Sequence, residues 1–441
     1  MLKLIYKNII AHRGRYCWIF IEMCLVALIG WAMLDDFIVN TYKRSLSPGY
    51  EIDHLVSFTF STYPIDPTAD SDGGESAEEI YTHINRILDR ARSDSRVEAA
   101  TFVNNSSFLQ GSVSINSVPT GEEDKNAIYY TVHFWPNTDF FKTFGIRNAY
   151  GSTDDLFEEP SMSGRDLIVS ESIARYIFGD EAVMGHYLEE KDSRANPEKL
   201  SRIVGVVNDC VYRPDFGTTP IVYKTRKVKN IGNRENMESI EGVLRLKSGV
   251  DVDKFIEDYS PVLATDLKSG PLYTHSLISY RDREKEMSRD MTNQSFIQAS
   301  ITVFFLVNIL LCMFGTFYLQ TRKRSEETGV MRTFGASRGF ILREMIGEGV
   351  LITTLAWLLG CFLYWLYIKD EGLAHVISGW SENATLTLQA MVPMWTDDFN
   401  FHFAVISLVI YALMLICTIA GIYIPAVKIA NINPVDALKD E

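Results

Sequence analysis

Four long apolar runs divide the chain into unlike parts. They span Cys17–Leu34, Phe296–Leu319, Met345–Ile368 and His402–Ile424. A helix rises about 1.5 Å per residue, so roughly 20 apolar residues cross the hydrocarbon core of a bilayer. The runs therefore predict an integral membrane protein with four transmembrane helices.

The segment between the first and second runs, residues 38–292, has the turn signals of a soluble domain. Within Ala77–Arg92, Ile80, Ile84 and Ile87 recur at the spacing of one helix face, which predicts an amphipathic helix. Runs rich in β-branched and aromatic residues predict strands at His54–Phe60, Ala127–Phe134, Arg202–Val207, Ile221–Lys224 and Val243–Lys247. Short helices are expected at Thr138–Phe144, Glu171–Phe178 and Val252–Asp266. The domain inserted between the first two spans is therefore expected to be α+β.

Two polar loops interrupt this domain. Pro64–Glu75 is crowded with Pro, Asp, Ser and Gly, and Glu189–Lys199 is charged and contains Pro197. Each loop is either the lip of a ligand site or a solvated insertion, and the sequence leaves both alternatives open.

The negative charge of the chain is concentrated in the inserted domain. The whole chain has a formal net charge of −14, and residues 35–295 alone hold 29 basic and 43 acidic side chains. An acidic surface repels phosphates, which argues against nucleic acid and against tight association of the domain with anionic lipid. Five of the six cysteines fall inside the apolar runs, so Cys210 has no partner for a disulfide within the domain.

Lysine and arginine flank the apolar runs unevenly. Four of them precede the first run without an acid and six lie between the second and third runs, whereas residues 369–401 have one Lys against five acids. Positive residues in short loops stay on the cytoplasmic side. Both termini and loop 320–344 are therefore predicted to be cytoplasmic, and the large domain extracytoplasmic. A cleaved signal peptide is the alternative for the N-terminus, although the small-x-small cleavage pattern is missing after the first run.

Motifs for nucleotide use and metal binding are absent from the sequence. It has no G-x-x-x-x-G-K-[ST] and no H-E-x-x-H. The expected cytoplasmic pieces, 1–16, 320–344 and 425–441, are too short to fold as an ATPase. The chain is therefore expected to have no catalytic site, metal or cofactor of its own, and ATP hydrolysis is expected in a separate subunit.

Three polar residues lie within or beside the apolar runs. Glu22, at a depth where a charge costs about 3 kcal/mol, is either a residue of a helix interface or conformational switch, or an acid close enough to the cytoplasmic end to reach water. Asn308 is expected to form an interhelical hydrogen bond. Glu348, near the start of the third run, is expected to extend to the cytoplasmic surface.

The segment Arg324–Arg338, between the second and third runs, is more organised than a simple connector. Its first part can continue the second span, and Gly335, Ala336 and Ser337 supply a break before the third span. We expect a short helical element at the membrane surface that can pass rigid-body motion from a cytoplasmic partner to the helices on either side. A plain charged surface loop is the alternative.

This segment resembles the R-E-I-G-x-x-R-x-x-G-A motif of the MacB/FtsX-type (type VII) ABC transporter permeases, the group that includes the lipoprotein-releasing permeases. The matching residues are Glu327, Gly329, Arg332, Gly335 and Ala336. The sequence departs from the motif at Glu326, where the family usually has Arg, and at Thr328, where it has Ile.

Other stretches resemble the same family in the same order. Residues 4–15 are similar to its amphipathic N-terminal helix, residues 139–146, 167–179 and 203–209 to its periplasmic core domain, and residues 425–438 to its closing segment. The resemblance implies an amphipathic helix at 1–16, transmembrane helices at 17–37, 293–319, 345–368 and 402–424, a MacB-like core domain at 38–292, a cytoplasmic coupling loop at 320–344, a short periplasmic loop at 369–401 and a cytoplasmic tail at 425–441.

The resemblance implies a permease subunit of the bacterial inner membrane that pairs with a second permease subunit, identical or paralogous, and recruits a cytoplasmic ABC ATPase. A periplasmic adaptor or an outer-membrane channel would be a further partner. It also implies mechanotransmission, in which ATP hydrolysis moves the outer domain to export or extract a hydrophobic compound, peptide or lipoprotein, with the five matching residues as the ATPase-coupling site. Envelope signalling or regulation of a cell-wall hydrolase is the alternative, and an enzyme domain on a membrane anchor is a third hypothesis.

Overall fold

The computed structural model describes two compact units of the chain. The described residues are 13–63, 76–104, 107–110, 112–119, 126–135, 138–149, 166–179, 183–188, 200–213, 217–231, 237 and 239–371 with 391–430. The polar loops predicted at Pro64–Glu75 and Glu189–Lys199 lie outside these residues, as do most of 1–16, part of 369–401 and most of 425–441. One unit contains residues 1–41, 293–375 and 394–441, and the other contains residues 42–292 and 376–393.

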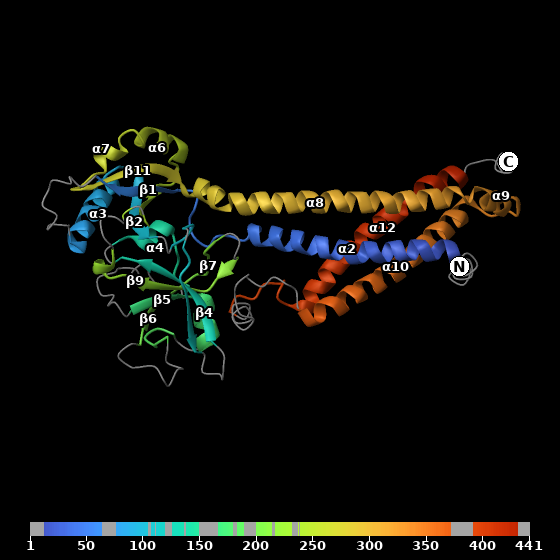
Figure 1. Cartoon of the computed structure of the whole chain (residues 1–441), viewed down its shortest axis with the longest axis horizontal. Coiled ribbons are helices and arrows are strands. Elements are labelled where there is room, and N and C mark those ends of the chain that lie inside the picture. The colour runs from blue at the N-terminus through green and yellow to red at the C-terminus, as the bar shows by residue number, and fades with distance from the viewer. Residues whose placement is uncertain are drawn as a thin grey trace. The chain divides into compact units, whose positions relative to one another are not determined.

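The first unit is built from long helices (Figure 1). Its helices are α2 (Arg13–Ser45), α8 (Tyr280–Arg322), α9 (Ser325–Thr333), α10 (Arg338–Glu371) and α12 (Phe399–Ala430). Within the described residues, four of them contain stretches of 24 to 32 residues that are long and apolar enough to cross a membrane. These helices and the α+β domain between the first two of them confirm the predicted fold class.

Small residues let the long helices approach closely. A Cβ added to Gly360 of α10 would lie 2.7 Å from Cβ of Ala27 and 2.8 Å from the carbonyl oxygen of Cys24, both on α2. A Cβ on Gly349 would lie 2.1 Å from the side chain of Ile422 on α12. Association of helices within lipid depends on such close backbone packing, because burial there brings little hydrophobic gain.

The second unit is an α+β domain with two main sheets. The first sheet is antiparallel, in the order β11-β1-β10-β2. Its strands are β1 (Leu55–Thr62), β2 (Val97–Asn104), β10 (Ile240–Leu246) and β11 (Leu272–Ser279). Helices α3 (Ala77–Arg92), α6 (Val252–Tyr259) and α7 (Leu263–Asp266) bury their apolar residues in one core cluster with this sheet. Helix α3 starts in a capping box, in which the Ser76 hydroxyl and the Glu79 carboxylate each accept a backbone N–H of the other residue.

The second sheet is mixed, in the order β3-β4-β9-β5-β6. Its strands are β3 (Ile115–Pro119), β4 (Asn126–Phe134), β5 (Asp166–Ser170), β6 (Arg202–Val207) and β9 (Ile221–Thr225). Helix α4 (Phe140–Phe144) follows β4 in the chain, and helix α5 (Glu171–Phe178) follows β5. A small ribbon pairs β7 (Cys210–Val211) with β8 (Thr218–Thr219), and η3 (Val228–Asn230) is a short 3-10 helix. Buried residues of both sheets, such as Leu55 and Val243 from the first and Tyr130 and Ile221 from the second, share one core cluster.

The segment between α10 and α12 contributes to this domain. Met391 is buried with Ile173 and Ile177 of α5 and Val169 of β5, and Val392 packs against the same cluster. The domain core therefore includes residues from both extramembrane connections, the one between α2 and α8 and the one between α10 and α12.

A buried histidine and a buried aspartate connect two of the long helices. His402, at the start of α12, has no exposed surface, and its Nε2 lies 2.6 Å from Oδ1 of Asp35 on α2. Its Nδ1 lies 3.0 Å from the carbonyl oxygen of Thr396. A carbonyl oxygen only accepts hydrogen bonds, so Nδ1 is the donor to Thr396 and Nε2 faces the carboxylate of Asp35. The pair thus joins α12 to α2.

Replacement of His402 by Ala should destabilise the helical unit, because the Asp35 carboxylate stays buried after losing its imidazole partner. Removal of one partner of a buried ion pair costs about 3–5 kcal/mol. The midpoint of thermal unfolding of the full chain in detergent should fall clearly. Asp35→Asn, which keeps an acceptor for the imidazole, should lower the midpoint less, and an unchanged midpoint in His402→Ala would contradict the assigned role.

Candidate functional site

The corner between α8 and α10 is formed by the short helix α9 (Figure 1). Its C-terminal end is a Schellman motif: the N–H of Ala336 donates to the carbonyl of Met331, and the N–H of Gly335 donates to that of Arg332, both at 3.0 Å. Gly335 has φ +88°, which a residue with a side chain rarely adopts. The sequence thus ends α9 here and lets α10 start at Arg338.

Helix α9 has one buried and one exposed face. Thr328 is buried, and its hydroxyl donates to the carbonyl of Arg324 at 2.8 Å. On the other face Val330 is 44% exposed, and Phe334, just after the helix, is 87% exposed. An exposed apolar pair at the tip of a charged corner is a surface on which another protein can dock.

A buried ion pair fixes the start of α9 to α10 and α2. Nη1 of Arg324 lies 2.5 Å from Oε2 of Glu348 on α10, and both side chains are almost completely buried. The hydroxyl of Tyr16 on α2 donates to the same oxygen at 2.9 Å. Nε of Arg324 also donates to Oε2 of Glu327, at 2.9 Å. We call Tyr16, Arg324, Glu327 and Glu348 the corner cluster.

The corner cluster keeps Arg324 charged although it is buried. Burial is the largest single influence and lowers the pKa of this guanidinium, but Glu348, Tyr16 and Glu327 together outweigh burial and raise the pKa of Arg324. Glu344, one turn before Glu348, is also buried, and its Oε1 has no hydrogen-bond partner among the described residues. A charged pair held in this way has little freedom to separate, so α9, α10 and α2 are joined at one point.

The structure gives the five predicted coupling residues three different surroundings. Glu327 belongs to the corner cluster, whereas the backbone of Arg332, Gly335 and Ala336 forms the end of α9. Gly329 is buried, and the Arg332 side chain is half-buried. All five lie on α9 or in the turn that follows it.

The three intramembrane candidates have different surroundings. Glu348 does not extend to the surface as expected: it is buried, because Arg324 supplies its countercharge inside the corner. The amide of Asn308 donates to the carbonyl of Phe304 at 2.7 Å within α8, in place of the expected interhelical bond. Glu22 accepts from the hydroxyl of Thr316 on α8 at 3.3 Å, as a residue at a helix interface would.

Sequence reasoning missed two members of the corner cluster. Arg324 was considered only as one of the positive residues between the second and third apolar runs, and Tyr16 was given no role. The Arg324 to Glu327 spacing of three residues is a local signal for a helix ion pair. Tyr16, by contrast, lies 332 residues from Glu348 in the chain, so no local pattern could join them.

The described residues of the corner offer contacts for a partner. Among the described residues no group of three or more His, Cys, Asp and Glu could hold a metal ion. Gly335-Ala-Ser-Arg-Gly339 has the letters of the G-x-S-x-G motif, but it lies between two helices and lacks the preceding strand that a nucleophile elbow requires.

Comparisons with known proteins give one family and a few similar structures. No curated protein matches the chain significantly. A domain of a putative permease protein from Porphyromonas gingivalis has 17% identity and a TM-score of 0.29, covering 53% of this chain and 93% of that one. The periplasmic region of MacB from Actinobacillus actinomycetemcomitans has 11% identity and a TM-score of 0.30, and the match covers 54% of this chain and 94% of that one. The extracellular domain of the noncanonic ABC-type transporter YknZ from Gram-positive bacteria has 11% identity and a TM-score of 0.27, and the match covers 50% of this chain and 100% of that one.

The family match covers the helical part of the chain. Residues 299–434 match the family model described as FtsX-like permease C-terminal. This region includes α9, α10, α12 and most of the corner cluster. Residues 299–434 of the chain are therefore similar to the C-terminal part of FtsX-like permeases.

Proposed function

We propose that the chain is the permease subunit of an ABC transporter and that α9 transmits the work of a separate cytoplasmic ATPase to the membrane helices. The observation that carries the proposal is the corner cluster. A partner that displaces α9 also displaces α10 and α2, because the buried Arg324–Glu348 pair and Tyr16 join these helices. The exposed Val330 and Phe334 offer that partner an apolar contact.

Transmission in this scheme ends in the α+β domain. Helix α2 runs without interruption to Ser45, and residues 46–54 connect it to β1, whereas α8 starts at Tyr280, directly after β11. Both helices are thus continuous with the domain backbone, so their movement reaches the domain. The work would serve export or extraction of a hydrophobic compound, peptide or lipoprotein, with a second permease subunit completing the transporter.

The proposed topology places α9 in the cytoplasm and the domain outside. Met391 supports it, because the α10–α12 connection packs in the core of the domain and must lie on the same side of the membrane. The excess of Lys and Arg near the ends of the spans sets the orientation. The same charges support cytoplasmic termini, and the resemblance to the MacB/FtsX-type permeases supports an inner-membrane location.

Reporter fusions test the topology. Alkaline phosphatase, which is active only outside the cytoplasm, should be active when fused after residue 260 and inactive when fused after residue 337. A fluorescent protein that folds only in the cytoplasm should give the opposite pattern. Phosphatase activity at the second position would refute a cytoplasmic α9.

Charge reversal at Arg332 tests recruitment of the ATPase. Arg332→Glu should remove at least about nine-tenths of the ATPase that co-purifies with the tagged chain in mild detergent, a loss equivalent to about 1.4 kcal/mol. Membrane insertion should be unchanged. Lys323→Glu makes the same charge change at an exposed position before α9 and serves as the matched control. Equal ATPase recovery from both variants would contradict the role of Arg332.

Substitution of Glu348 tests transmission separately from recruitment. Glu348→Gln should leave the exposed face of α9 intact, so the ATPase should still co-purify, but hydrolysis should no longer move the domain, as read by a fluorescent pair within it. It should also destabilise the chain by about 3–5 kcal/mol, because Arg324 stays buried after losing a countercharge. The double variant Arg324→Met with Glu348→Met should recover stability, and wild-type domain movement in Glu348→Gln would refute transmission through the pair.

A further inference from the structure

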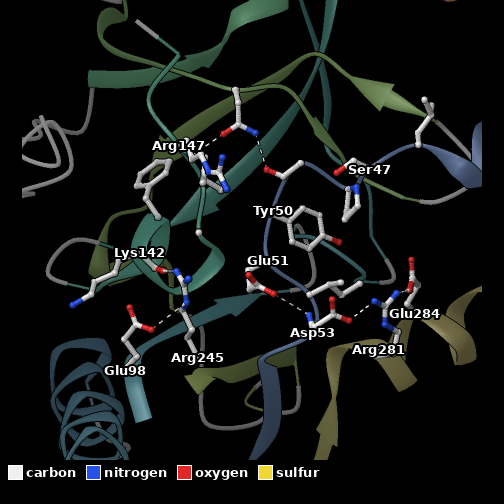
Figure 2. Close-up of a pocket in the computed structure, with 18 of the residues that line it drawn as sticks. Ser47, Tyr50, Glu51, Asp53, Glu98, Lys142, Arg147, Arg245, Arg281 and Glu284 are labelled. Carbon is white, nitrogen blue, oxygen red and sulfur yellow. Dashed lines mark hydrogen bonds and ion pairs between the residues drawn. The ribbon is translucent and has the colours of Figure 1, made fainter. Parts of the chain in front are cut away.

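A large pocket lies within the α+β domain, where the chain enters it from α2 and leaves it into α8. Its volume is about 1360 Å³, enough for a ligand larger than a typical drug molecule. The lining comes from residues 44–53 at and after the end of α2, residues 141–148 around the end of α4, and the first turns of α8. Single residues come from β2, β10 and the position after β6. Figure 2 shows these side chains around the pocket.

The pocket wall is held together by one asparagine. The Nδ2 of Asn208 donates to the carbonyl of Gly49 at 2.7 Å, and its Oδ1 accepts the N–H of Arg147 at 2.7 Å. The backbone N–H of Glu51 donates to the carbonyl of Phe144 at 2.7 Å. These hydrogen bonds fix the backbone segments that line the pocket to one another. The space between the segments is therefore part of the folded domain.

Three of the four acidic residues that line the pocket form ion pairs with arginine. Asp53 pairs with Arg281, which also reaches Glu284 at 3.4 Å. Glu98 lies 3.5 Å from Nε of Arg245. Glu51 accepts the N–H of Asp53 at 3.3 Å and is the one lining acid without an ion pair among the described residues.

Two cations of the pocket remain available. The side chains of Lys142 and Arg147 are exposed and form no ion pair with the described residues. In Figure 2, Arg147 lies across the pocket from the row of paired groups that runs from Glu98 to Arg281. The lining holds five Lys and Arg residues against four acids, whereas residues 35–295 as a whole hold 29 against 43. The pocket is thus a basic site on an acidic domain.

Apolar side chains lie beside these cations. Tyr50, Ile52, Phe141 and Ile146 also line the pocket, and their side chains are almost fully buried. A ligand with an anionic group and an apolar part would match both features.

We propose that this pocket binds an anionic ligand through a phosphate group held by Arg147, with Lys142 as a further positive charge of the lining. A guanidinium donates two parallel hydrogen bonds to a phosphate, and an ammonium adds a point charge. The phosphate belongs either to a soluble molecule or to a lipid headgroup, and both sources share this chemistry. The site goes beyond the proposed transmission of motion, because it requires neither the ATPase nor nucleotide.

The test is titration calorimetry on the full chain at low ionic strength, without ATPase. Inorganic pyrophosphate represents a soluble phosphate, and nanodiscs of phosphatidylglycerol, compared with phosphatidylcholine, represent a lipid headgroup. Saturable binding of pyrophosphate to the detergent-purified chain assigns a soluble source. Binding that needs phosphatidylglycerol, read as a higher unfolding temperature in those nanodiscs, assigns a lipid source, and either result supports the site.

Three substitutions should change binding in different directions. Arg147→Gln should weaken it at least about tenfold, because a charge-assisted hydrogen bond is lost. Glu51→Gln keeps the acceptor for the N–H of Asp53 and removes a repelling charge, so it should tighten binding about threefold. Lys254→Gln, on α6 and outside the pocket lining, is the matched control and should leave affinity unchanged.

Two outcomes would overturn the proposal. One is no saturable response to pyrophosphate together with no preference for phosphatidylglycerol over phosphatidylcholine. The other is equal affinity in Arg147→Gln, Lys254→Gln and wild type, provided that all three elute as the same folded species. Either outcome leaves the proposed ATPase coupling untouched, because that function is measured by co-purification and domain movement.

Discussion

The buried ion pair between Arg324 and Glu348 sets the position of α9 against α10. Two charges out of water are costly unless each finds a well-placed counterpart, and a buried pair that loses one member is strongly destabilised. Here Tyr16 and Glu327 complete the set of partners. The first turn of α9 therefore has one favourable position relative to α10 and α2, which is what a mechanical joint requires. Small residues such as Gly360 bring the helix backbones into contact along their length.

The α+β domain is stabilised by apolar burial without a disulfide. Its two main sheets share a core, and helices cover the outer face of the first sheet. Cys210 is buried and unpaired, in agreement with the single cysteine of the domain sequence. Met391, from the connection between α10 and α12, is buried in the core that the connection between α2 and α8 forms. The two connections therefore lie on the same side of the membrane.

The local pattern of apolar and polar residues was enough to predict the long helices, but not enough to predict every shorter helix and strand. The amphipathic helix Ala77–Arg92 was predicted with its observed bounds, since apolar spacing and a cap define it. The helix expected at Val252–Asp266 is two helices, α6 and α7, because Pro261 between them cannot donate a backbone hydrogen bond. Strand β11 was missed: Ser276 has φ +58° and the pairing with β1 shifts register, which breaks the alternation that identifies a strand.

In the candidate site, too, features that depend on neighbouring residues could be predicted, and features that depend on packing between helices could not. The motif placed α9 and its terminating glycine correctly, because both depend on neighbouring residues. The corner cluster was invisible, since a charge in the sequence has the same letter whether it faces water or a partner from another helix. Arg324 and Glu348 differ from ordinary flanking charges only through packing, and the sequence alone does not contain the distance between α9 and α10.

The Schellman motif at the end of α9 has a thermodynamic consequence for association. Gly335 and Ala336 satisfy the last carbonyls of the helix from within the chain, so α9 keeps its shape without help from another protein. A preformed element loses little conformational entropy when it is captured, and more of the contact energy remains as affinity. A rather small apolar tip can then suffice for a tight complex.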